Sequence, residues 1–171
     1  MTATAWQRSW IRILTTLLTA AVMVMIFAFS TEDAEHSDRT SGLISRRVLS
    51  IIHPDYEQLE ESRQKLLYDD IQHVVRKCAH FTEYTLLGLM LRLCLESWFG
   101  HRVKKSRSLT LAGFCGGTTY ACTDEFHQLL IEGRSGQWSD VLVDGSGVLL
   151  GVMIGMLLIR HVIKRINAEK E

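Results

Sequence analysis

The sequence lacks the features that mark several large classes of protein. It has no CxxC pair and no Cys/His spacing typical of a structural zinc site, and all of its cysteines lie within apolar blocks. A disulfide framework is therefore not expected. We interpret the cysteines as small apolar core residues: Cys78, Cys94, Cys115 and Cys122. A formal net charge of zero without a basic block argues against a nucleic-acid partner.

Signals for common catalytic and repetitive architectures are also missing. The chain has no nucleophile elbow around a serine or cysteine, no glycine-rich loop that cradles phosphate, and no internal repeat. No linker separates a second folded unit. A length of 171 residues therefore predicts one domain, residues 1–171.

Hydrophobic residues make up 47% of the chain and gather into long blocks. Each block has roughly the 20 residues that an α-helix needs to cross a bilayer. The blocks lie at about 11–29, 74–99, 109–131 and 141–159. The first is longer than the apolar core of a signal peptide, so we interpret it as an uncleaved signal anchor. The sequence thus predicts an all-α polytopic membrane protein, a bundle of four transmembrane helices.

The distribution of Lys and Arg predicts the orientation of this bundle, because basic residues concentrate in cytoplasmic segments. Basic residues precede the first block, separate the second from the third, and follow the fourth: Arg8, Arg12, Arg102, Lys104, Lys105, Arg107, Arg160, Lys164 and Arg165. With four spans these groups share one side. We therefore expect a multi-pass protein of the cytoplasmic (inner) membrane with both termini in the cytoplasm.

The segment at about 31–73 is extracytoplasmic in this topology and has helical periodicity. One apolar face carries Leu43, Ile44, Val48, Ile51 and Ile52, and Pro54 ends that unit; a second stripe follows up to about Val74. Two amphipathic helices on the outer leaflet fit this pattern. A solvated helical hairpin fits the periodicity equally well.

Polar residues converge at the outer ends of the second, third and fourth blocks. Residues three or four apart share a helix face, as do His80 and Tyr84, Asp124 and Gln128, or Asp140 and Asp144. Glycines at 147, 151 and 155 predict close helix packing that carries these acids inward. Near the inner ends, Arg92 and Glu96 are expected to snorkel toward the interface. Intramembrane ionisable groups usually face a bundle interior or a water-filled cavity.

Two stretches of the sequence resemble the signatures of the VanZ-like membrane protein family. The stretch "RKCAHFTEYTLLG" resembles K-x-x-H-F-x-E-Y-x-x-L-G, and "TDEFHQLLIEGRSGQWSDVLVDGSGVLLG" resembles D-E-x-x-Q followed by G-R and D-x-x-x-[ND]-x-x-G. The polar end of the family's first helix resembles "FAFST". The resemblance covers most of the chain and implies a membrane protein of the bacterial cell envelope. Because the family's namesake is associated with teicoplanin resistance, it also suggests a link to glycopeptide resistance.

The family motifs and the convergence of polar groups select the same candidate pocket. Its residues are Lys77, His80, Glu83, Tyr84, Asp124, Glu125, Gln128, Arg134, Asp140 and Asp144. We expect the pocket to bind a lipid-linked envelope precursor or a polar small molecule, with membrane lipids as the other partners and no nucleic acid. The sequence leaves the oligomeric state open.

Two alternatives remain open at this point. The first is an intramembrane hydrolase or transferase acting on a lipid-linked substrate, with His80 or Glu125 as general base and Arg134 stabilising charge. The second is a purely structural cluster, in which a buried ion pair of Asp140 with Lys77 or of Asp124 with Arg134 fixes the register of the helices. No cofactor is predicted, because no recognised metal motif is present. The residues with suitable donor atoms for a metal would be His80, Glu83, Asp124 and His127.

Overall fold

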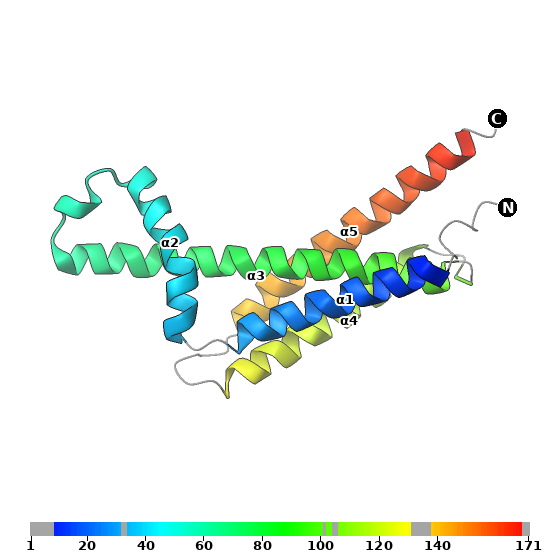
Figure 1. Ribbon diagram of the computed structural model, residues 1–171, viewed down its shortest axis with the longest axis horizontal. Coiled ribbons are helices and arrows are strands. Elements are labelled where there is room, and N and C mark those ends of the chain that lie inside the picture. The colour runs from blue at the N-terminus through cyan, green and yellow to red at the C-terminus, as the bar shows by residue number, and fades with distance from the viewer. Residues whose placement is uncertain (1–8, 32–33, 101, 104–105, 131–137, 169–171) are drawn as a thin grey trace.

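The computed structural model describes residues 9–31, 34–100, 102–103, 106–130 and 138–168, and the regular secondary structure within them is entirely helical. The elements are α1 (Ser9–Ser30), α2 (Ala34–Ile52), the short 3-10 helix η1 (Tyr56–Gln58), α3 (Glu61–Phe99), α4 (Ser106–Gln128) and α5 (Trp138–Ala168). The predicted all-α class is confirmed. Figure 1 shows α1, α4 and α5 gathered around one part of α3, with α2 crossing its other part.

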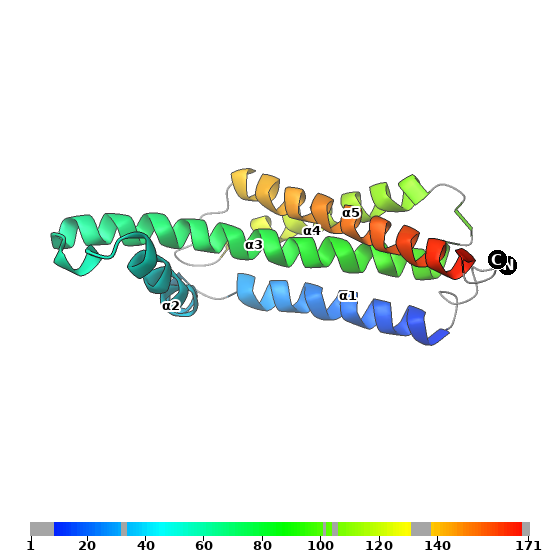
Figure 2. The same ribbon diagram turned by 90° about the horizontal axis from the view of Figure 1, so that it is seen from above.

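The central element of the fold is α3, which contacts α1, α2, α4 and α5. Its 39 residues correspond to a length of about 58 Å, nearly twice the thickness of a bilayer's hydrocarbon core. In Figure 2, α1 lies on one side of α3, and α4 and α5 lie on the other. A shared core joins these helices, with Val22, Tyr84, Ala121 and Val148 all buried. The helix with the most extensive contact to α3 is α5.

The structure joins two segments that the sequence predicts as separate. The expected extracytoplasmic segment ends near residue 73 and the second span begins near Val74, yet Glu61–Phe99 is one helix. No glycine or proline lies between residues 61 and 87, so nothing interrupts helical hydrogen bonding there. As predicted, α2 ends before Pro54. It packs on the protruding part of α3, where Gln72 Nε2 donates to Ser41 Oγ at 3.4 Å.

Glycines bring α3 and α5 into backbone contact. A methyl group at Gly151 would fall on the carbonyl oxygen of Thr85, and one at Gly147 would lie 2.6 Å from that of Phe81. On the other helix, a methyl group at Gly88 would meet the carbonyl of Val148. Only glycine permits such proximity, as in the small-residue interfaces of membrane helices. The predicted role of the α5 glycines in packing is confirmed.

Two of the described helices are long and apolar enough to cross a membrane: α1 and the Trp138–Arg165 part of α5. Helices α3 and α4 carry too many polar residues to qualify by composition, so the count of four spans stays a prediction. The outer surfaces of α1 and α5 are nevertheless unsuited to water. Large hydrophobic residues exposed on them include Ile13, Leu14, Leu17, Val24, Leu142, Leu149, Leu157 and Leu158.

Arg92 does not snorkel as predicted. Its side chain is fully buried, and its guanidinium donates to Glu96 Oε2 at 2.8 Å, Ser106 Oγ at 2.9 Å and Thr110 Oγ1 at 3.3 Å. The two hydroxyls belong to α4, so Arg92 ties α3 to α4 inside the bundle. These partners offset the free-energy penalty of burying the arginine's charge.

The cysteines are also placed differently from the prediction. All four are free thiols, which agrees with the absence of a disulfide framework. However, Cys78, Cys115 and Cys122 are exposed on the surface of the bundle, and Cys94 is partly exposed. The prediction of core positions was wrong because an apolar block contains both inward-facing and outward-facing positions.

Candidate functional site

The polar residues of α3, α4 and α5 meet at the end of the bundle nearest α2. The first contact is an ion pair between Lys77 of α3 and Asp140 of α5, with Nζ and Oδ1 3.0 Å apart. About a third of the lysine side chain and a quarter of the aspartate side chain stay exposed (31% and 27%). This pairing of Lys77 with Asp140 was one of the register-fixing ion pairs that the sequence suggests. This partly exposed ion pair lies at the edge of the cluster.

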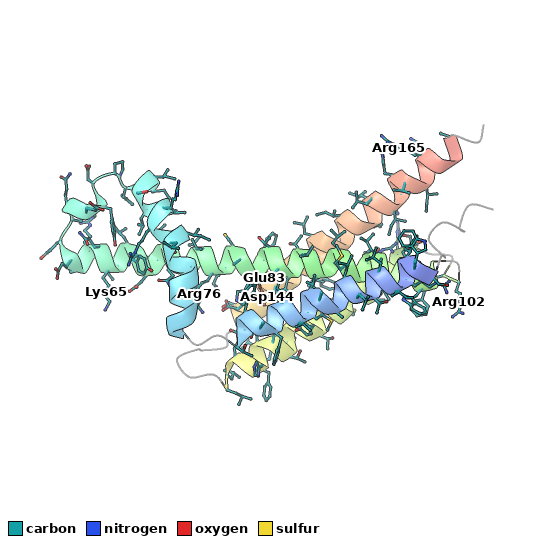
Figure 3. All side chains as sticks on the ribbon, viewed as in Figure 1. Lys65, Arg76, Glu83, Arg102, Asp144 and Arg165 are labelled. Carbon is teal, nitrogen blue, oxygen red and sulfur yellow. The ribbon has the colours of Figure 1, made fainter. Side chains whose placement is uncertain are left out.

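One turn deeper, His80 faces Asp144. His80 Nδ1 lies 3.5 Å from Asp144 Oδ1, within ion-pair range but without hydrogen-bond geometry. The Asp144 side chain is completely buried, and neither carboxylate oxygen has a hydrogen-bond partner among the described residues. Figure 3 shows Asp144 midway along the molecule, far from the end where Arg102 and Arg165 lie. A buried carboxylate in this condition is unusual, because most buried polar groups are hydrogen-bonded.

Asp124 and Tyr84 extend the cluster toward α4 and the core. Asp124 is 4% exposed and its Oδ2 accepts a hydrogen bond from Gln128 Nε2 at 3.3 Å, whereas Oδ1 has no hydrogen-bond partner among the described residues. The hydroxyl of fully buried Tyr84 is likewise without one, although it lies close enough to interact electrostatically with Asp124 and Asp144. The cluster therefore holds polar atoms that the described protein groups leave unsatisfied.

Glu125 completes a group of three side chains, on three different helices, whose donor atoms could bind one metal ion. His80, Glu125 and Asp144 each offer a ligand atom, and these atoms lie within 4.8 Å of one another. This set shares only His80 with the donors suggested by the sequence. His127 instead stacks on Phe27 of α1, with ring centroids 4.9 Å apart. Glu83 is partly buried on α3 and interacts electrostatically with His80, while Arg134 lies outside the described residues.

Sequence reasoning missed polar groups around the cluster. Tyr120 of α4 donates its hydroxyl to the Met23 carbonyl of α1 at 2.7 Å, and its ring lies 6.4 Å from that of Tyr84. Its position four residues before Asp124 is the helical spacing that would have indicated it. Thr118 of α4 has a buried hydroxyl without a hydrogen-bond partner among the described residues. The same is true of Ser30, which the polar end of the first apolar block already indicated. No pattern in the sequence indicated Thr118.

A shallow groove runs along the outer face of α3 and α5 beside the cluster. It has a volume of about 540 Å³ and is lined by Val74, Lys77, Cys78, Phe81, Thr82, Val143 and Ser146. Most of this lining is apolar, and Lys77 is its only charged member. The lysine thus borders both the groove and the polar cluster, through its ion pair with Asp140.

Comparison with known proteins decides the family. The family model VanZ/LLP1 matches residues 15–160, from within α1 to within α5. The chain belongs to the VanZ/LLP1 family. No curated protein and no solved structure matches it. The part matched to VanZ/LLP1 contains the whole polar cluster, the glycine contacts of α3 with α5, and the Arg92 contacts.

Proposed function

We propose that this VanZ/LLP1-family protein is an integral membrane protein with four spans whose polar cluster binds a polar or lipid-linked ligand of the cell envelope. The observation that carries the proposal is the state of Asp144, fully buried with both oxygens lacking a hydrogen-bond partner among the described residues. A cluster that served packing alone would satisfy its polar atoms, because each unsatisfied buried group costs about 1–3 kcal/mol. A ligand that enters the cluster would supply the missing partners.

The groove beside the cluster supports a ligand with an apolar chain. Val74, Phe81 and Val143 provide an apolar wall that opens outward from the bundle, where lipid would lie. Lys77 stands between this wall and the acids, so it can meet a phosphate or carboxylate at the head of the chain. Apolar walls with a few convergent polar groups are typical of small-molecule sites. This arrangement favours a lipid-linked ligand over a wholly polar one.

The exposed surface supports insertion in the membrane. Leu43, Ile44, Ile51 and Ile52 are exposed on α2, as are the apolar side chains on α1 and α5. Figure 3 shows Arg102 and Arg165 at the end of the molecule opposite Asp144, and Arg12 donates to the Ser97 carbonyl near the end of α3. By the distribution of positive charge, this end becomes the cytoplasmic end. In this orientation the cluster opens toward the outer leaflet and α2 lies along the outer surface.

Reporter fusions test the topology directly. A reporter fused at Lys104 should be cytoplasmic, and reporters at Ser37 and Gly136 should be extracytoplasmic. The basic residues between α3 and α4 are the reason for this expectation. A cytoplasmic signal at Ser37 would contradict the orientation, and with it an outward-facing pocket.

Mass spectrometry of co-purifying lipids and envelope precursors tests the ligand. Wild-type protein and Lys77→Met should be purified in parallel, with Gly116→Ala as the control, because a methyl group there meets open space. We expect an enriched polyprenyl- or phospholipid-like species in wild type and control, and at least about tenfold less in Lys77→Met, equivalent to about 1.4 kcal/mol. The same bulk-lipid profile in all three samples would favour a purely structural cluster. Teicoplanin susceptibility of cells that express these variants would test the suggested link to glycopeptide resistance.

A further inference from the structure

We propose that His80, Glu125 and Asp144 hold a divalent transition-metal cation of the Zn²⁺ class inside the bundle. This metal site rests on the proposed function, since the cation would occupy the same pocket and present positive charge to the ligand's phosphate or carboxylate. It differs from the donors suggested by the sequence in two of its three residues. The geometry of three helices, rather than any sequence motif, defines it.

The distances suit one shared cation. Bond lengths of about 2.0–2.2 Å around a four-coordinate ion place neighbouring donor atoms about 3.3–3.6 Å apart. His80 Nδ1 and Asp144 Oδ1 are already 3.5 Å apart. The whole set of donor atoms lies within 4.8 Å, so Glu125 needs a side-chain shift of about 1 Å to reach the same ion. One donor comes from each of α3, α4 and α5, and a bound cation would therefore fasten all three helices together.

The carboxylates around Asp144 also favour a bound cation. Asp144 is fully buried, and within the described part of the chain its one ion-pair contact is with His80. Lys77 is already engaged by Asp140. A buried carboxylate is strongly unfavourable unless it is both paired and hydrogen-bonded, and neither oxygen of Asp144 has a hydrogen-bond partner among the described residues. A divalent ion bound by two carboxylates and a neutral imidazole would give a site with no net charge.

The neighbouring residues suit a site with an open coordination position. A set of three protein donors is typical of zinc sites that keep the fourth position for water or a ligand, whereas structural sites use four. Asp124 Oδ1 and the Tyr84 hydroxyl are buried without a hydrogen-bond partner among the described residues. They can orient whatever occupies the fourth position, as groups around metal ligands commonly do. His127 is unsuited to the site because it stacks on Phe27.

Metal analysis of the full-length protein in detergent tests the site. Wild type, Asp144→Asn and His80→Gln would be purified without chelator, incubated with Zn²⁺ and desalted before elemental analysis. We expect about one zinc per chain in wild type, as a three-donor site implies, and at least about a tenfold weaker retention in both variants. His127→Gln is the matched control, a partly buried histidine outside the donor set, and should retain zinc as wild type does. His80→Cys should restore retention, since thiolate is a zinc ligand.

Two further measurements distinguish a variant that fails to fold from one that folds but does not bind metal. Helix content by circular dichroism should be equal in wild type and Asp144→Asn, and chelator should lower the melting temperature of wild type but not of Asp144→Asn. Zinc-free wild type, or equal zinc in wild type and Asp144→Asn, would overturn the metal site. Lys77→Met should keep its zinc while it loses the co-purifying lipid. Lipid without zinc in wild type would refute only the metal site, and zinc without an enriched lipid would refute the proposed ligand.

Discussion

Two buried charged centres in the same bundle have opposite hydrogen-bonding states. Arg92, near the predicted cytoplasmic end, donates to Glu96, Ser106 and Thr110. Asp144, nearer α2, has no hydrogen-bond partner among the described residues for either carboxylate oxygen. Both side chains are fully buried. The hydrogen bonds of Arg92 hold α3 against α4, as expected of a structural residue. The carboxylate oxygens of Asp144 remain available to accept hydrogen bonds from a ligand or to bind a cation.

Loose packing does not explain the difference. A methyl group at Gly155 would lie 3.0 Å from the Cβ of Arg92, and one at Gly147 would lie 3.3 Å from the Cβ of Tyr84 beside Asp144. The helices therefore pack tightly at both centres. Side chains in a close-packed protein interior have little freedom to find another partner. Asp144 is thus held in an unsatisfied position by the fold itself.

The largest expected effect is on the Arg92 centre. Arg92→Leu keeps an apolar side chain of useful size but leaves Glu96, which is 16% exposed, without its partner inside the bundle. We expect a loss of about 3–5 kcal/mol in the free energy of unfolding, typical of breaking a buried ion pair. Unfolding in mixed micelles would measure it, with exposed Arg107→Leu on α4 as the control. A loss no greater than that of Arg107→Leu would show that the hydrogen bonds of Arg92 do not hold α3 against α4.

Crowding the helix contact should affect both centres together. Gly151→Ala places a methyl group on the Thr85 carbonyl, and because backbone cannot move aside as a side chain can, α5 must shift. We expect a loss of about 1–3 kcal/mol in stability, together with loss of the co-purifying ligand. Gly116→Ala, which meets nothing within 4 Å, should change neither. A stable Gly151→Ala that retains its ligand would indicate that the cluster does not depend on this close approach.

The sequence predicts one of the two centres and misjudges the other. The glycine face correctly carried Asp144 inward, and the structural alternative correctly paired Lys77 with Asp140. The prediction that Arg92 snorkels toward the interface was wrong. Its partners Ser106 and Thr110 lie on another helix, and nothing in the sequence indicates that they face Arg92. Sequence reasoning also grouped His127 with possible metal donors, although the rotation of α4 turns that ring toward Phe27.

The extents of the helices were predictable because they depend on local sequence. The contacts were not predictable because they depend on residues far away along the chain. Continuous apolar runs fix α1 and most of α5, since only local sequence is needed to indicate such a span. In α3 the segment predicted at about 31–73 is fused with the predicted second span. The absence of glycine and proline between residues 61 and 87 indicates this continuity, but the change from polar to apolar composition suggested a boundary. Which face of each helix is buried depends on its neighbours, as the exposed Cys78, Cys115 and Cys122 show.

Neutralising Asp144 should have the opposite sign to the loss of Arg92. In chelator-treated protein, Asp144→Asn removes a buried charge that lacks hydrogen bonds and keeps the side-chain shape. We expect a gain on the order of 1 kcal/mol in stability, because part of the desolvation penalty disappears. The same unfolding assay as for Arg92→Leu would detect it. Destabilisation by several kcal/mol would mean that Asp144 is a structural residue after all and would remove the contrast between the two centres.

The smallest expected effect is the coupling between Lys77 and Asp140, on the rim of the polar cluster around Asp144. A double-mutant cycle of Lys77→Met and Asp140→Asn isolates this pair, and the cycle of Arg92→Leu and Glu96→Gln provides the comparison. Since both rim side chains are about a quarter to a third exposed, we expect a coupling of at most about 1 kcal/mol that weakens with added salt. The buried pair should couple more strongly and respond less to salt. A rim coupling as large and as salt-resistant as that of Arg92 with Glu96 would mean that lipid or protein desolvates the ion pair, so that no water reaches the cluster around Asp144. A weak, screened coupling would instead mean that water reaches the entrance of the cluster, as entry of a polar headgroup requires.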